Sequence, residues 1–183
     1  MSTFPLEQKT LTYVIDVNSF PMDWFHDQTY FKFVEEIRAA VTEVQRLGIF
    51  EFKEAFSPKE WKEAVISFKF EKMDATPQDP RIFDKYGVCR VTTDANGRRI
   101  AQIRFDSEQQ WTHKGWYTWN PWSEKIHFRA VVLHELLHAL GWTEHTPEDV
   151  RDFSIMAVGN AGGYCKTIPR FDQWHIRKIY GLA

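Results

Sequence analysis

The sequence predicts a fold that mixes strands and helices within one domain, in the α+β or mixed α/β class. Three observations predict it: short stretches of alternating apolar and polar residues, long segments with apolar residues at helical spacing, and no strict alternation of the two. The 183 residues suffice for one sizeable core and leave little room for a second. An apolar fraction of 43% and a charged fraction of 26% exclude disorder as the dominant state.

Strands are predicted wherever the apolar residues recur at every second position. The first segment shows this with Leu11, Tyr13 and Ile15. Residues 74–97 are rich in Pro, Asp and Gly and are predicted to be mostly loop, ending in a turn at 94–97. The four predicted strands cover residues 11–17, 49–56, 65–70 and 99–106.

Helices are predicted where apolar residues recur every three or four positions, as Val34, Ile37 and Val41 do. Gly48 and Gly141 are suited to end the first two helices, because glycine tolerates a left-handed backbone. Ser57-Pro58-Lys59-Glu60 resembles a capping box and predicts one short helical turn. The three longer predicted helices cover residues 28–47, 125–140 and 169–180.

Charge and composition exclude several classes of protein. The 23 basic residues are balanced by 25 acidic ones, which argues against a nucleic-acid partner. The chain has no apolar run of about 18 residues, so no membrane span is expected, and residues 1–10 lack the pattern of a signal peptide. Cys89 and Cys165 are either one disulfide or two buried thiols, and the sequence leaves both open.

Aromatic residues make up 16% of the chain, and four of the eight tryptophans fall between Trp111 and Trp122. Two interpretations are open: a platform that stacks on sugars or on a protein partner, or rings that seal the core. We favour the core, because aromatic side chains dominate core energetics.

The segment from His134 to His145 carries the chemistry. His134 and His138 are four residues apart on a predicted helix, so both imidazoles project from one face and can bind the same small cation. Glu135 can reach a water at that cation without being a ligand. Gly141 allows a sharp turn, after which His145 can return as the third ligand. The five spaced residues fit HExxHxxGxxH, a pattern that chance rarely produces on a helical segment.

Three neutral imidazoles favour Zn²⁺ with a fourth position open, which is typical of a catalytic site. Three histidines can also hold copper, nickel or cobalt, so zinc is expected from availability and geometry rather than from affinity alone. The other histidines have no second ligand at a useful spacing and are interpreted as surface or hydrogen-bonded residues: His26, His113, His127 and His175.

With these residues the segment resembles the metzincin clan of zinc endopeptidases, whose motif is followed by a Met-turn. Ser154-Ile155-Met156 is similar to that turn, with Met156 as an apolar base beneath the metal. Within the clan the chain is most similar to the matrixins. That resemblance rests on Phe105-Asp106 followed by Trp111-Thr112, on the order of the early elements, and on four positions of the last helix: Asp172, Ile176, Tyr180 and Gly181.

The resemblance implies a metzincin-like fold: a twisted, mostly parallel sheet with an antiparallel edge strand, a backing helix, an active-site helix and a C-terminal helix. It implies one metalloprotease catalytic domain over residues 1–183, with subdomains of about 1–141 and 142–183. Glu135 would be the general base. Extended peptide substrates would bind along an edge strand near Arg99–Phe105, and the pocket wall is expected at Tyr164, Ile168 and Pro169.

Departures from the family limit what carries over. Residues 81–94 contain no histidine, so no second zinc is expected. Ser107 and Gln109 stand where acids of a calcium site would be expected, which argues against structural calcium. Phe171 replaces one acid of the pair that anchors the N-terminus in the family. No tyrosine stands two residues after Met156, so no extra tyrosine ligand is expected.

The predicted function is zinc-dependent endopeptidase activity on protein or peptide substrates. The alternative is a metal-binding structural or interaction module of a larger particle, which the intact Glu135 disfavours. A carbohydrate hydrolase would rest only on the tryptophans. We expect a monomer without nucleic-acid or membrane partners, although a larger assembly is left open, and an extracellular or virion-associated location despite the missing signal peptide.

Overall fold

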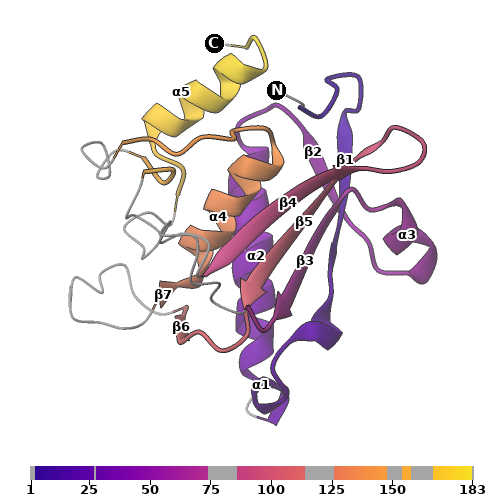
Figure 1. The fold of residues 1–183 in the computed structure, drawn as a ribbon, viewed down its shortest axis with the longest axis vertical. Coiled ribbons are helices and arrows are strands. Elements are labelled where there is room, and N and C mark those ends of the chain that lie inside the picture. The colour runs from indigo at the N-terminus through magenta and orange to yellow at the C-terminus, as the bar shows by residue number, and fades with distance from the viewer. Residues whose placement is uncertain are drawn as a thin grey trace.

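The computed structural model describes residues 3–26, 28–73, 86–113, 126–147, 154–157 and 167–182. Its centre is a five-stranded sheet in the order β2-β1-β3-β5-β4 (Figure 1). The strands of this sheet are β1 (Thr10–Ile15), β2 (Glu51–Glu54), β3 (Ile66–Glu71), β4 (Gly87–Thr93) and β5 (Arg99–Asp106). A separate two-stranded ladder joins β6 (Trp111–Thr112) to β7 (Ile126–His127).

Three of the helices are longer than the others. Val17–Ser19 form a 3₁₀ turn, η1, directly after β1. The α-helices are α1 (Met22–His26), α2 (Thr29–Gln45), α3 (Pro58–Glu63), α4 (Phe128–Ala139) and α5 (Arg170–Ile179). The expected mixed fold is thus confirmed, and the three long predicted helices are present within a few residues of their expected bounds.

All neighbouring strands of the large sheet are parallel except for one pair. Strands β1, β2, β3 and β5 run in the same direction, whereas β4 is antiparallel to β5, with Gly87 opposite Phe105 and Thr93 opposite Arg99. β4 lies at the edge. The expected mostly parallel sheet with an antiparallel edge strand is therefore confirmed.

The position of the edge strand corrects two sequence predictions. Residues 74–97 were predicted to be mostly loop, but Gly87–Thr93 form β4. Arg99–Phe105 were predicted to be the edge, but they belong to β5, which lies between β3 and β4. Both errors have one cause. The second half of β4 carries polar and exposed residues, so it lacks the apolar pattern that predicts a strand. Its pairing with β5 also spans a turn at 94–97, which local composition identifies only as loop.

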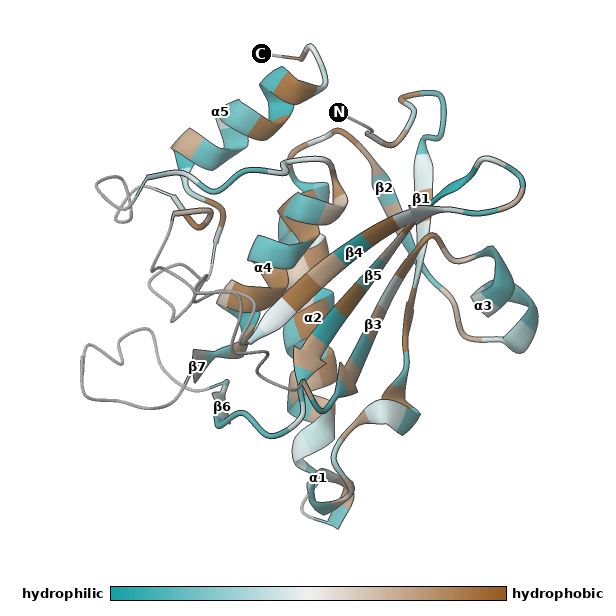
Figure 2. Cartoon of the chain, in the orientation of Figure 1, coloured by the Kyte–Doolittle hydropathy of each residue, from teal (hydrophilic) through white to brown (hydrophobic). Residues whose placement is uncertain are grey.

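The helices α2 and α4 cover the same face of the sheet (Figure 1). Every second residue of β5 is buried, and Figure 2 shows this strand as a mixture of hydrophobic (brown) and hydrophilic (teal) positions. Arg99, Ala101, Ile103 and Phe105 are buried, while the intervening residues are more exposed. Because α4 lies between α2, the sheet and the following segments, it is apolar on nearly all sides, as expected of a buried helix.

Several predicted helix ends are confirmed in detail. The Ser57 hydroxyl accepts a hydrogen bond from the Glu60 N–H, and the Glu60 carboxylate accepts one from the Ser57 N–H, so the capping box is complete. Gly48 and Gly141 both have positive φ, at 70° and 107°. Such backbone is strained for other residues, so these glycines allow the chain to leave α2 and α4 sharply.

Trp111 belongs to the core. Its ring packs edge-on against Phe105 and Phe128, with centroids 6.2 and 5.2 Å away, and its Nε1–H donates to the Asp106 carbonyl. The prediction that the aromatic cluster seals the core behind α4 is therefore confirmed for Trp111. The other three tryptophans, Trp116, Trp119 and Trp122, lie outside the described residues.

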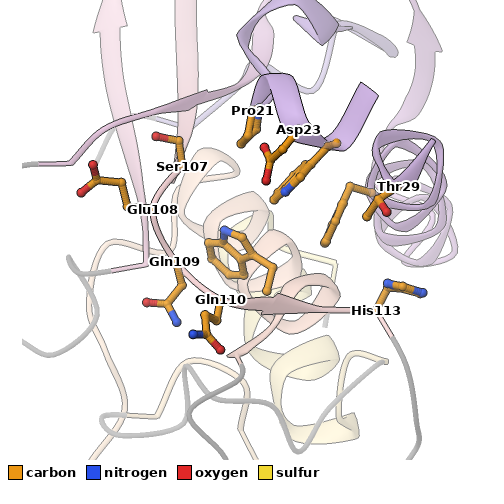
Figure 3. Close-up of a pocket in the computed structure, with 11 residues that line it drawn as sticks. Pro21, Asp23, Thr29, Ser107, Glu108, Gln109, Gln110 and His113 are labelled. Carbon is orange, nitrogen blue, oxygen red and sulfur yellow. The ribbon is translucent and has the colours of Figure 1, made fainter. Parts of the chain in front are cut away.

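A cavity of about 400 Å³ opens beside Trp111, at the end of β5 and next to α1 (Figure 3). Asp23 and Thr29 lie on one side of it, and Gln109, Gln110 and His113 lie on the other. None of the three predicted metal ligands lines this cavity. Among the described helices, none is long and apolar enough to cross a membrane.

Candidate metal centre

The active-site candidate is built by α4 and the turn that follows it. His134 and His138 lie one helical turn apart on α4, as predicted from their spacing. The helix ends at Ala139, and Gly141 reverses the chain with its φ of 107°. This reversal brings His145 back to the two helical imidazoles, so that all three histidines offer ligand atoms within 4.8 Å of one another.

The spacing of the three imidazoles fits a small tetrahedral ion. The Nε2 atom of His134 lies 3.1 Å from those of both His138 and His145, and the remaining pair is 3.3 Å apart. With metal–nitrogen bonds of about 2.05 Å, tetrahedral ligands would lie about 3.3 Å apart. The three histidines are therefore positioned to bind zinc, and three ligands leave the fourth corner for another group.

Two backbone carbonyls fix the orientation of the helical imidazoles. His134 Nδ1 lies 2.9 Å from the Ile155 carbonyl, and His138 Nδ1 lies against the Trp142 carbonyl. A carbonyl only accepts hydrogen bonds, so each Nδ1 carries the proton and donates it. In the neutral ring, Nε2 then keeps its lone pair for the metal.

The surroundings keep these imidazoles neutral. Burial lowers the pKa of His138 to about 4 and holds the pKa of His134 well below its ordinary value. The neighbouring imidazoles lower both pKa values further, because two positive charges at this separation repel each other. At neutral pH both rings are thus in the form that binds a metal.

The segment Ser154–Ala157 forms hydrogen bonds at two of the ligands. The Ile155 carbonyl accepts a hydrogen bond from His134 Nδ1. The Met156 carbonyl accepts one from the N–H of Thr146, the residue after His145. Met156 itself is fully buried. The segment therefore connects two of the three ligands, and this is where the sequence predicted a Met-turn.

A buried carboxylate from α5 holds this segment in place. Asp172 Oδ1 accepts a hydrogen bond from the Ser154 hydroxyl, and Oδ2 accepts one from the Ile155 N–H, both at 2.6 Å. The Thr146 hydroxyl donates to the Ser154 oxygen, which also accepts from the Met156 N–H. Burial outweighs these hydrogen bonds and raises the pKa of Asp172 to about 6.

The last carbonyls of α4 are capped from two distant parts of the chain. Arg99, at the start of β5, donates from Nη2 to the Ala139 carbonyl at 3.0 Å, and its guanidinium lies over the Phe4 ring. Tyr180, just after α5, donates its hydroxyl to the Leu140 carbonyl at 2.7 Å. These bonds satisfy groups that a helix end leaves without helical partners, directly beside the ligand His138.

Glu135 lies on the side of α4 that faces the edge strand. It is only 3% exposed, and its side chain packs against the backbone of Gly87, the first residue of β4. The thiol of Cys89, two residues further along β4, has its pKa raised first by burial and then by the Glu135 carboxylate. Cys89 is a free thiol in the structure, and Cys165 lies outside the described residues.

The residues predicted for the substrate pocket have different surroundings. Ile168 is buried in the core, and its N–H donates to Glu43 of α2 at 3.3 Å. Pro169 immediately precedes α5, and Tyr164 lies outside the described residues. Their role in a pocket stays a prediction.

Sequence reasoning missed the groups that support the ligands. The carbonyls of Trp142 and Ile155 carry no signal, because every residue has one. Asp172 was predicted only as one of the family positions of the last helix, whereas in the structure it holds the segment around Ile155. His127 was expected at the surface or hydrogen-bonded, and the structure excludes the surface, because His127 is buried at the start of α4.

The structure combines a mostly parallel sheet and an antiparallel edge strand with a helix that carries two of three clustered imidazoles. This combination defines the class of zinc metallopeptidases with the metzincin fold. A search of curated proteins gives no match. The sequence model of the matrixin peptidases matches residues 5–181, and the chain belongs to the matrixin family. This is a family of zinc metalloendopeptidases, so the predicted enzyme class, catalytic zinc and peptide-bond hydrolysis follow from membership.

Proposed function

We propose that the chain cleaves extended polypeptides internally, with Glu135 as the general base and His134, His138 and His145 as the zinc ligands. The observation that carries the proposal is the placement of Glu135. Glu135 directly follows the ligand His134 on α4, and its side chain packs against Gly87 at the start of the edge strand β4. Zinc held by the imidazoles would supply Lewis-acid chemistry, which makes water a nucleophile near neutral pH.

Glu135 has the surroundings that a proton carrier requires. It follows His134 directly, and its low exposure keeps bulk water away from the carboxylate. In the proposed reaction Glu135 accepts the proton of the attacking water and later passes it to the leaving amine. Met156, fully buried in the segment that holds His134, would serve as the apolar base of the site.

The substrate is proposed to extend the sheet at β4. One side of this strand pairs with β5, and its residues from Arg90 to Thr93 are exposed. An extended peptide can add to such an edge through main-chain hydrogen bonds, which depend little on its sequence. This moves the expected substrate strand from Arg99–Phe105 to Gly87–Thr93.

The test is a digest of a peptide library and of an unfolded protein by three samples: wild type with zinc, wild type treated with a chelator, and Glu135→Gln with zinc. Loss of a general base costs about 100- to 10,000-fold in rate. We expect Glu135→Gln to bind one zinc per chain with wild-type affinity and to lose cleavage by that factor. Zinc should restore the chelated enzyme.

Two outcomes would contradict the proposal. If Glu135→Gln cleaves like wild type, another group is the base. If zinc-loaded wild type cleaves nothing in the library, the alternative of a metal-binding structural or interaction module is favoured, since such a module needs the metal but not the carboxylate.

A further inference from the structure

The start of the edge strand lies unusually close to the active-site helix. Gly87 is buried, pairs with Phe105 of β5 and approaches Val131 and Glu135 of α4. A Cβ atom built on Gly87 would lie 2.8 Å from Val131 Cγ1, 3.3 Å from Glu135 Cγ and 3.4 Å from Glu135 Oε1. Carbon atoms pack at about 3.5–4.0 Å, so the first contact would force a displacement of about 0.7 Å or more.

The two residues that leave no room for a side chain lie on one face of α4. Val131 and Glu135 are four positions apart, so they form a ridge one helical turn long that faces β4. Val131 is 2% exposed and belongs to the core, so it has little freedom to move away. The Cγ atom of Glu135, one helical turn further along α4, also lies against Gly87.

We infer that Gly87 is a positioning residue that sets the spacing between the substrate-binding edge of β4 and the carboxylate of Glu135. The inference rests on the proposed function. A peptide paired to β4 moves with that strand, and Glu135 moves with α4. The distance between Gly87 and the Val131–Glu135 ridge therefore sets how far the peptide backbone lies from the general base.

The kinetic consequence follows from this geometry. A misplacement of about 1 Å can lower catalysis by about 100-fold when reacting groups must be aligned. Adding a methyl group at Gly87 moves β4 outward, but it leaves the hydrogen-bonding edge of the strand intact. The turnover number kcat should therefore fall, while KM, which reflects pairing with the edge, should change little.

The test uses four variants. Gly87→Ala introduces the contact. Gly87→Ala combined with Val131→Ala removes Cγ1, the atom at 2.8 Å, and Val131→Ala alone is its reference. Gly97→Ala is the matched control: Gly97 lies in the β4–β5 turn with φ of 77° and no other atoms within 4 Å of an added Cβ, so it strains the hairpin without changing the spacing. For each variant we would measure kcat, KM, zinc per chain and Tm.

We expect Gly87→Ala to lose about 10- to 100-fold in kcat, with KM within about threefold of wild type and one zinc per chain. The double variant should regain most of the kcat of Val131→Ala. Gly97→Ala should lower Tm and leave kcat near wild type. If Gly87→Ala does not fold, a folded double variant with the kcat of Val131→Ala supports the inference.

Several results would overturn it. These are a Gly87→Ala enzyme with kcat within about twofold of wild type, a folded Gly87→Ala enzyme whose loss of activity follows loss of zinc, a double variant no more active than Gly87→Ala, or a double variant that also fails to fold. An inactive wild type would instead refute the proposed function, so the two failures are distinguishable.

Discussion

The effect of burial on Asp172, the carboxylate that holds the segment around Ile155 in place, can be tested through the pH dependence of stability. Its carboxylate is fully buried, accepts two hydrogen bonds at 2.6 Å, and has a pKa of about 6. Burial disfavours the charged form, whereas both hydrogen bonds favour it, and burial is the larger effect. The carboxyl group therefore binds its proton more tightly in the folded protein than in the unfolded chain.

This difference predicts how stability depends on pH. Between the unfolded pKa of 3.8 and the folded pKa of about 6, the folded state holds more protons at this group. Its contribution to stability is fully present below the unfolded value and is lost as pH rises through the folded value. From pH 7 to pH 5 the contribution should grow by about 1.4 kcal/mol, because one pKa unit corresponds to about 1.36 kcal/mol.

The assay compares wild type with Asp172→Asn by urea unfolding at pH 5, 6 and 7. The amide has nearly the shape of the protonated acid, accepts from the Ile155 N–H and donates to Ser154, but it does not titrate. Other groups titrate equally in both proteins, so the difference between their free energies of unfolding isolates Asp172. The free energy of unfolding of wild type should rise relative to that of Asp172→Asn as the pH falls.

A difference that does not change with pH would refute this account of burial. A flat difference is also the result expected if the two short hydrogen bonds outweigh burial, because a folded pKa below 3.8 would change the contribution by less than about 0.1 kcal/mol between pH 5 and pH 7.

Three further predictions concern the same region. Asp172→Ala should weaken zinc binding by about 10-fold, measured by competition with a chromogenic chelator, because it frees the segment whose Ile155 carbonyl orients His134; unchanged affinity would mean that this segment holds its place unaided. Tyr180→Phe should lower the free energy of unfolding by about 1–2 kcal/mol, since the buried Leu140 carbonyl loses its donor, and no loss in urea unfolding would argue against the cap. Removal of zinc by a chelator should lower Tm in wild type, and its addition should restore Tm, whereas a Tm unaffected by zinc would indicate that the histidine cluster does not bind the ion in the folded state.

The tertiary structure corrected the sequence analysis where contacts are long-range. β4 was predicted as loop because its exposed second half lacks an apolar pattern, and its identity as a strand depends on pairing with β5. For the same reason Arg99–Phe105 were mistaken for the edge. A strand becomes an edge only through what lies beside it, and local composition does not contain that information.

The sequence by itself determined the local parts of this protein. The spacing of His134 and His138 follows from the helical period, and Gly141 allows the turn that returns His145 because it adopts a positive φ. Only the tertiary structure decided which groups support that site. The Ile155 carbonyl, Asp172 on α5 and the contact of Gly87 with Glu135 join segments far apart in the chain, and such contacts depend on packing rather than on periodicity.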